Sequence, residues 1–120
     1  MMDTSTFSAQ VREENKMAVI DLAGLINAQA DQVFKQAYGE AEAMNSETIA
    51  LNFSAVDYIN STGIALIVEL LAQARKSHKH LIVYGLSDHY VEIFQITRLA
   101  DFMDIFEDES SALSEEVRTQ

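Results

Sequence analysis

Val56-Asp57-Tyr58-Ile59-Asn60-Ser61-Thr62-Gly63-Ile64 places two hydroxyl groups and a glycine where a strand is expected to stop and a helix to begin. The first turn of a helix has backbone N–H groups without partners and carries partial positive charge, so it accommodates an anion. A phosphate on Ser61 would be held there, which makes Ser61 a candidate switch. The same residues have a purely structural explanation. Ser is a good N-cap, and Gly63 allows two backbone segments to approach closely.

Short apolar runs alternate with helical periodicity on both sides of this junction. Residues 17–22, 48–53 and 81–85 indicate buried strands, with 7–13 as an edge strand and 105–106 as a short last strand. Helical spacing predicts helices from about residue 30 to 44 with Asn27 as N-cap, from the junction to about residue 79, and after Ser87 or Asp88. Residues 108–120 predict a marginal terminal helix or a frayed end.

This order of elements predicts an α/β fold. We expect a single domain over residues 1–120, in which a mixed four- to five-stranded sheet is packed with about four helices.

The composition limits the classes of partner. The formal net charge of −11 should repel nucleic acid and anionic membrane surfaces alike. The absence of cysteine excludes disulfides and thiolate metal sites and is compatible with a reducing compartment. The first residues lack a basic segment followed by an apolar run, so we expect a cytoplasmic protein.

The candidates for catalysis or metal binding are few. The glycines are isolated, which gives no support to a nucleotide-binding loop, and His78, His80 and His89 have no carboxylate at a recognisable metal-site spacing. Asp21 and Asp57 could each act as a general base or bind Mg²⁺, but solvated turn residues are the simpler interpretation. We therefore expect no metal, no cofactor and no enzymatic activity.

The helix after the junction has an unusually wide apolar arc. Ile64, Ile67, Val68 and Leu71 form one stripe, and Leu66 and Leu70 lie beside it. Either the helix is buried on two sides, which we favour, or part of it contacts a partner.

These features together resemble the STAS domain family, in the form of the bacterial anti-sigma factor antagonists. The resemblance covers nearly the whole chain. It rests on a strand that ends at Gly24 with a polar residue at Asn27, on the strand at 49–53, and on residues 60–64 opening a long aliphatic helix.

The resemblance implies a function that the residues alone do not. In that family the hydroxyl residue matching Ser61 is phosphorylated by a serine kinase that is also an anti-sigma factor, and a phosphatase reverses the reaction. The unphosphorylated antagonist binds the kinase and frees a sigma factor. Thr62 would be a secondary acceptor or a helix-start residue, and the implied partner-binding residues are Asn27, Asp57, Asn60, Ser61, Thr62, Gly63, Leu66 and Leu70.

Two residues depart from the family pattern. Asn60 and Asn27 stand where the family usually has Asp, which removes negative charge near the expected phosphate. An alternative is therefore a STAS subunit that is not phosphorylated and serves as a docking module in a larger signalling or lipid-transport complex. An enzyme or small-ligand binder of this fold is the third alternative.

Overall fold

The computed structural model describes residues 7–118; residues 1–6 and 119–120 of the expected 1–120 domain lie outside this description. The strands are β1 (Phe7–Glu14), β2 (Met17–Ile26), β3 (Thr48–Ile59), β4 (His80–Tyr84) and β5 (Asp104–Phe106). The α-helices are α1 (Asp31–Ala43), α2 (Ser61–Lys76), α3 (Asp88–Ile96) and α4 (Glu109–Arg118), and two short 3₁₀ helices are η1 (Ala28–Ala30) and η2 (Leu99–Phe102).

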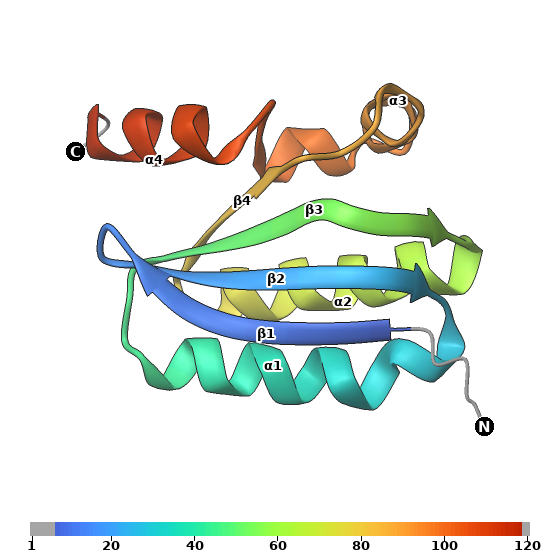
Figure 1. The fold of residues 1–120 in the computed structure, drawn as a ribbon, viewed down its shortest axis with the longest axis horizontal. Helices are drawn as coiled ribbons and strands as arrows, with labels where there is room; N and C mark the ends of the chain where they lie inside the picture. The colour runs from blue at the N-terminus through green and yellow to red at the C-terminus, as the bar shows by residue number, and fades with distance from the viewer. Residues whose placement is uncertain (1–6, 119–120) are drawn as a thin grey trace.

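The five strands form one mixed sheet in the order β1-β2-β3-β4-β5. β1 and β2 pair antiparallel, whereas β2, β3, β4 and β5 pair parallel to their neighbours. In Figure 1, α1 lies on one side of the strands and α4 on the other. The predicted α/β fold, with a mixed sheet of four to five strands and about four helices, is confirmed.

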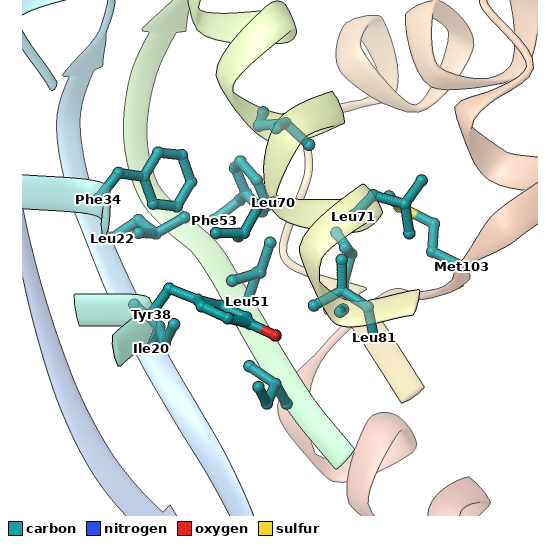
Figure 2. Packing of buried hydrophobic residues seen from close by; sticks show 14 of the residues in the cluster. Ile20, Leu22, Phe34, Tyr38, Leu51, Phe53, Leu70, Leu71, Leu81 and Met103 are labelled. Carbon is teal, nitrogen blue, oxygen red and sulfur yellow. The ribbon is translucent and has the colours of Figure 1, made fainter. Parts of the chain in front are cut away.

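Successive side chains of a strand point to opposite faces of the sheet, so each face has its own hydrophobic core. Ala18, Ile20 and Leu22 of β2 face the larger core, to which α1, α2 and α3 contribute. Figure 2 shows Ile20 and Leu22 in this core, together with residues of α1 and α2. Met17 and Val19 face the smaller core beneath α4. The fully buried side chains are mostly aliphatic, and the larger core adds Phe34 and Phe94 from α1 and α3.

The central strands are longer than the sequence predicts. The predicted strand at 48–53 continues to Ile59, and the predicted strand at 17–22 continues through Gly24 to Ile26. Between the pairs Asp21–Asn52 and Ile26–Ile59, β2 advances five residues while β3 advances seven, through two register shifts. Such bulges break the apolar alternation from which strands are predicted. Gly24, with φ of 95°, lies at the second shift.

The smaller core explains why the C-terminal segment is a docked helix and not a frayed end. Ala112 of α4 is fully buried, and Leu113 packs against the same cluster. The Asp108 carboxylate accepts a hydrogen bond from the N–H of Ser111 at 2.9 Å, which caps the first turn.

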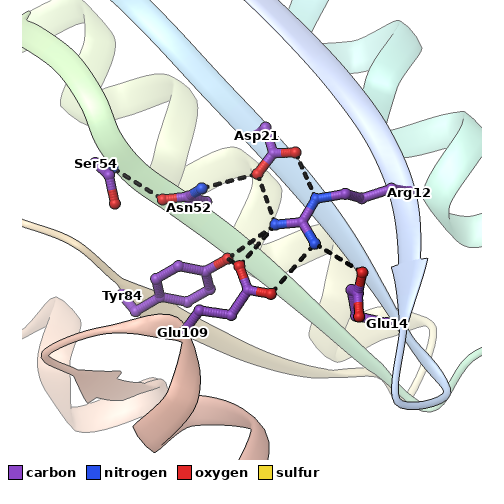
Figure 3. Close-up of polar contacts among 7 residues, drawn as sticks. All are labelled: Arg12, Glu14, Asp21, Asn52, Ser54, Tyr84 and Glu109. Atoms are coloured by element: carbon purple, nitrogen blue, oxygen red, sulfur yellow. Dashed lines mark hydrogen bonds and ion pairs between the residues drawn. The ribbon is translucent and has the colours of Figure 1, made fainter.

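A charged network ties α4 to four strands (Figure 3). The Arg12 guanidinium donates to Asp21 at 2.7 Å and to Glu109 at 2.7 Å, joining β1, β2 and α4. The Tyr84 hydroxyl of β4 donates to Glu109 at 2.7 Å, and the Asn52 amide of β3 donates to Asp21 at 2.8 Å. The interpretation of Asp21 as a solvated turn residue is therefore wrong, because it lies within β2 and is ion-paired.

Acid should weaken this network. Hydrogen bonds from Arg12 lower the pKa of Asp21, helped by Asn52, and lower the pKa of Glu109, helped by Tyr84. A carboxylate with a lowered folded-state pKa stabilises the fold above its unfolded pKa, near 4, and this contribution is lost as pH falls through the folded value.

We predict that Arg12→Met reduces the free energy of unfolding at pH 7 by about 1–2 kcal/mol, since the network is partly exposed and screened by water. The variant should also lose less stability than wild type between pH 6 and pH 3. Urea unfolding at several pH values measures both effects, with Lys35→Met as the control for loss of one surface cation. Equal pH dependence in wild type and Arg12→Met would contradict the assignment.

Candidate functional site

The candidate site lies where β2 and β3 end together. Ile26 and Ile59 are register partners at the carboxyl ends of these parallel strands. Asn27 follows the first and Asn60 the second, and the N–H of Asn60 donates to the carbonyl of Ile26 at 3.1 Å. The two Asn residues at which the chain departs from the family pattern therefore lie next to each other in space.

Asn60, and not Ser61, is the N-cap of α2. Its backbone is extended, and its side-chain Oδ1 accepts a hydrogen bond from the N–H of Gly63 at 2.9 Å. The structural explanation of Ser61 as the N-cap is therefore wrong. Ser61 is the first residue of the helix, and both Ser61 and Thr62 are exposed.

Asn27 caps in the same way. Its Oδ1 accepts from the N–H of Gln29 at 2.9 Å and begins η1, so the predicted helix start is correct in place but the first turn is 3₁₀. The α-helix begins at Asp31, one turn later than the Asn27 cap predicted.

Gly63 allows the helix to pack against the end of β2. A Cβ added at Gly63 would lie 2.1 Å from the carbonyl oxygen of Ile26 and 2.9 Å from Cγ2 of Ile59. Real Cβ atoms do not approach a carbonyl oxygen this closely, so the close backbone contact that the sequence suggested is present and requires glycine. Gly63 positions the site and is itself buried.

Tyr90 fixes the last residue of β3, and sequence reasoning missed it. The Tyr90 hydroxyl accepts from the N–H of Ile59 at 2.9 Å and donates to the carbonyl of Ile59 at 3.3 Å. α3 supplies this residue, with Ser87 as its N-cap. A buried tyrosine hydroxyl needs a polar partner, and the buried helix position of Tyr90 was the only available signal.

Asp57 lies on the exposed part of β3 before the cap. It borders a small pocket of about 70 Å³ with Val56, Ser87 and Tyr90 among its other lining residues. Asp57 is thus a solvated strand residue, where the sequence indicated a solvated turn.

Leu66 and Leu70, which the family resemblance includes in the partner-binding surface, lie on a side of α2 that α1 covers in part. Leu70 is only 6% exposed, and Leu66 is half-buried. Both line a groove of about 330 Å³ between α2 and α1, with Phe34 and Tyr38 on the opposite side. Burial of this side of α2, the interpretation that we favour from the wide apolar arc, holds for Leu70 because α1 covers it. The large exposed apolar residue of α2 is Val68, at 43%.

The electrostatics of the helix start favour an anion. The first turn of α2 contains no acidic residue, and its partial positive charge is directed at the exposed hydroxyls of Ser61 and Thr62. Among the described side chains, those of residues 7–114, no group of three His, Cys, Asp or Glu is arranged to hold a metal ion. In that same range no helix is long and apolar enough to cross a membrane.

Comparison with known proteins identifies a family. A model described as the STAS domain matches residues 8–112. The anti-sigma-B factor antagonist of Listeria monocytogenes is 27% identical over 99 residues, which cover 82% of this chain and 87% of that protein.

Two solved structures show the shared fold. The anti-sigma factor antagonist SpoIIAA in its unphosphorylated form gives a TM-score of 0.71 at 17% identity, covering 94% of this chain and 100% of that chain. The Bacillus cell fate determinant SpoIIAA in the phosphorylated form gives 0.68 at 20% identity, covering 90% and 98%.

The Gly63 contact gives a stability prediction with an internal control. Gly63→Ala should reduce the free energy of unfolding by about 2–4 kcal/mol, because the added methyl group forces α2 away from the end of β2. Gly39→Ala, inside α1, meets nothing within 4 Å and should stabilise by about 0.5–1 kcal/mol. Urea unfolding of both variants is the measurement. Equal effects of the two substitutions would refute the close contact at Gly63.

Proposed function

The chain belongs to the STAS domain family, and from this we propose that it is an anti-sigma factor antagonist switched by phosphorylation of Ser61. In the proposed cycle, the unphosphorylated protein binds an anti-sigma factor that is also a serine kinase, and thereby frees a sigma factor. Phosphorylation of Ser61 ends this binding, and a phosphatase restores it. The protein acts in the cytoplasm, by competition for a partner and not by catalysis.

The observation that carries the proposal is that the N-cap of α2 and the proposed phosphorylation site are two different residues, Asn60 and Ser61. Asn60 provides the capping oxygen, so the fold does not use the Ser61 hydroxyl for that purpose. Ser61 is exposed at the first helical position, where a kinase can reach it. A phosphate can therefore be added without removing a hydrogen bond on which the helix depends.

The local electrostatics tolerate the modified form. A phosphate adds about −1.5 to −2 charges and three acceptor oxygens, and the start of a helix is favourable for both. Asn27 and Asn60, the neighbouring polar residues, are uncharged and do not repel it. The phosphorylated protein should therefore keep its fold and change only its surface.

The energetic demand on such a switch is small. A hundredfold loss of partner affinity corresponds to about 2.7 kcal/mol. Burying one poorly paired phosphate at an interface costs at least this much. The proposed binding surface around Ser61 consists of Asn27, Asp57, Asn60, Thr62 and the half-buried Leu66.

The similar proteins support this assignment. The Listeria relative is named an anti-sigma-B factor antagonist, and the structure of SpoIIAA has been solved in both unphosphorylated and phosphorylated forms.

The second candidate function is that of a docking module that is not phosphorylated. The uncharged Asn27 and Asn60 favour it, because they remove acidic groups that a kinase of the usual type could contact.

The test compares charge at Ser61 with the same charge elsewhere. Ser61→Asp should abolish retention of an anti-sigma serine kinase that wild type retains from lysate of the source organism. Ser110→Asp is the matched control, since Ser110 is an exposed hydroxyl residue in the first turn of α4. Circular dichroism establishes equal folding of the three proteins.

A second readout separates the two candidates. Incubation with that kinase and ATP should add one phosphate to wild type and none to Ser61→Ala, as measured by intact mass. A partner retained equally by wild type and Ser61→Asp, together with an unchanged mass, would reject the switch and leave the docking module.

A further inference from the structure

A second surface of α2 is exposed and apolar. It is a groove of about 650 Å³ between α2 and the segment from the end of α3 through η2. Its apolar lining consists of Ile64, Val68, Leu71, Ala72, Leu99 and Phe102. We call it the α2–η2 groove. It lies on a different side of α2 from the groove lined by Leu66 and Leu70.

Two of the large apolar lining residues are exposed to an unusual extent, whereas Leu71 and Leu99 are buried. Phe102 is 51% exposed and Val68 43%. Ile96, which precedes the lining residue Thr97, is 70% exposed. Exposed apolar side chains that gather in one place, unlike scattered ones, mark a surface that another molecule covers.

The charge of the groove is opposite to that of the chain. Arg75, Lys76 and Arg98 line it, and no Asp or Glu among the described residues does, although the chain has eight basic and nineteen acidic residues. Arg75 lies over the Phe102 ring at 5.1 Å, and Arg98 pairs with Asp101 at 2.6 Å. Among the ion pairs of the described side chains of residues 7–114, none involves Arg75 or Lys76.

We propose that the α2–η2 groove binds an acidic amphipathic helix of a partner protein. Ile64, Val68 and Leu71 follow one stripe of α2 that continues to Arg75, a length of roughly 16 Å or three helical turns. A helix laid along this stripe would place its apolar face against Val68 and Phe102. Its acidic residues would meet Arg75, Lys76 and Arg98 at the rim.

The charge pattern also argues against a second copy of this chain as the occupant. In a two-fold symmetric dimer, the same patch meets itself, so Arg75 and Lys76 of both copies would be brought into one interface without acidic partners in the groove lining. The surrounding net charge of −11 would oppose association further. Ser61 does not line this groove, so the proposed contact is distinct from modification of Ser61 itself.

The test uses a pair of synthetic helical peptides with equal apolar faces. Each has 15 residues with Leu at helical spacing, and the flanking positions are Glu in one and Lys in the other. The overall charge of the protein favours the Lys peptide, whereas the groove favours the Glu peptide. We expect the Glu peptide to bind more tightly in fluorescence anisotropy, and to shift NMR signals of Val68 and Phe102.

Matched variants locate the binding. Val68→Asp should weaken the Glu peptide at least about tenfold, whereas Val33→Asp, an equally exposed valine on α1, should not. Arg75→Gln with Lys76→Gln should weaken it by a similar factor, and Lys16→Gln with Lys35→Gln should not.

Three results would overturn the proposal. One is tighter binding of the Lys peptide. Another is equal weakening by Val68→Asp and Val33→Asp. The third is concentration-dependent dimerisation of wild type that Val68→Asp abolishes, because the groove would then belong to a second copy of the chain.

Discussion

The close contact between the start of α2 and the end of β2 determines the geometry of the site. Gly63 packs against the Ile26 carbonyl, and the same carbonyl accepts a hydrogen bond from Asn60. Because a side chain at position 63 cannot fit, the helix start is held against the sheet edge. Tyr90 of α3 holds the end of β3 in place through two hydrogen bonds between its hydroxyl and the backbone of Ile59. The exposed hydroxyl of Ser61 is therefore presented on a rigid support.

This arrangement separates the requirements of the fold from those of the proposed switch. Asn60 satisfies the helix, and Ser61 remains accessible one residue later. The opposite face of the sheet is held independently, by the Arg12 network and by Ala112 of α4. The two regions of α2 differ in chemistry. Its first turn has no acidic side chain and tolerates an anion, whereas the α2–η2 groove along one side has an apolar lining with basic residues at its rim.

The sequence predicts the fold because strong apolar runs and helical spacing coincide with the real elements. It underestimates β3 because two register shifts destroy the alternation between Asn52 and Ile59. It also assigns the cap wrongly, since Asn60 and Ser61 are both good capping residues and only the backbone geometry distinguishes them. The Arg12 network depends on how α4 packs against the sheet, which periodicity within one segment does not reveal.

The central claim is that Ser61 can carry a phosphate without loss of the structure that presents it. The most direct measurement is the ¹H–¹⁵N NMR spectrum of the protein with phosphate on Ser61, compared with the unmodified protein. We expect the shifts to be confined to the start of α2 and its neighbours, and the Gly63 amide to keep the protection from exchange that its bond to Asn60 provides. Widespread shifts through the sheet, or loss of protection at Gly63, would show that phosphorylation unfolds the junction and would contradict the account.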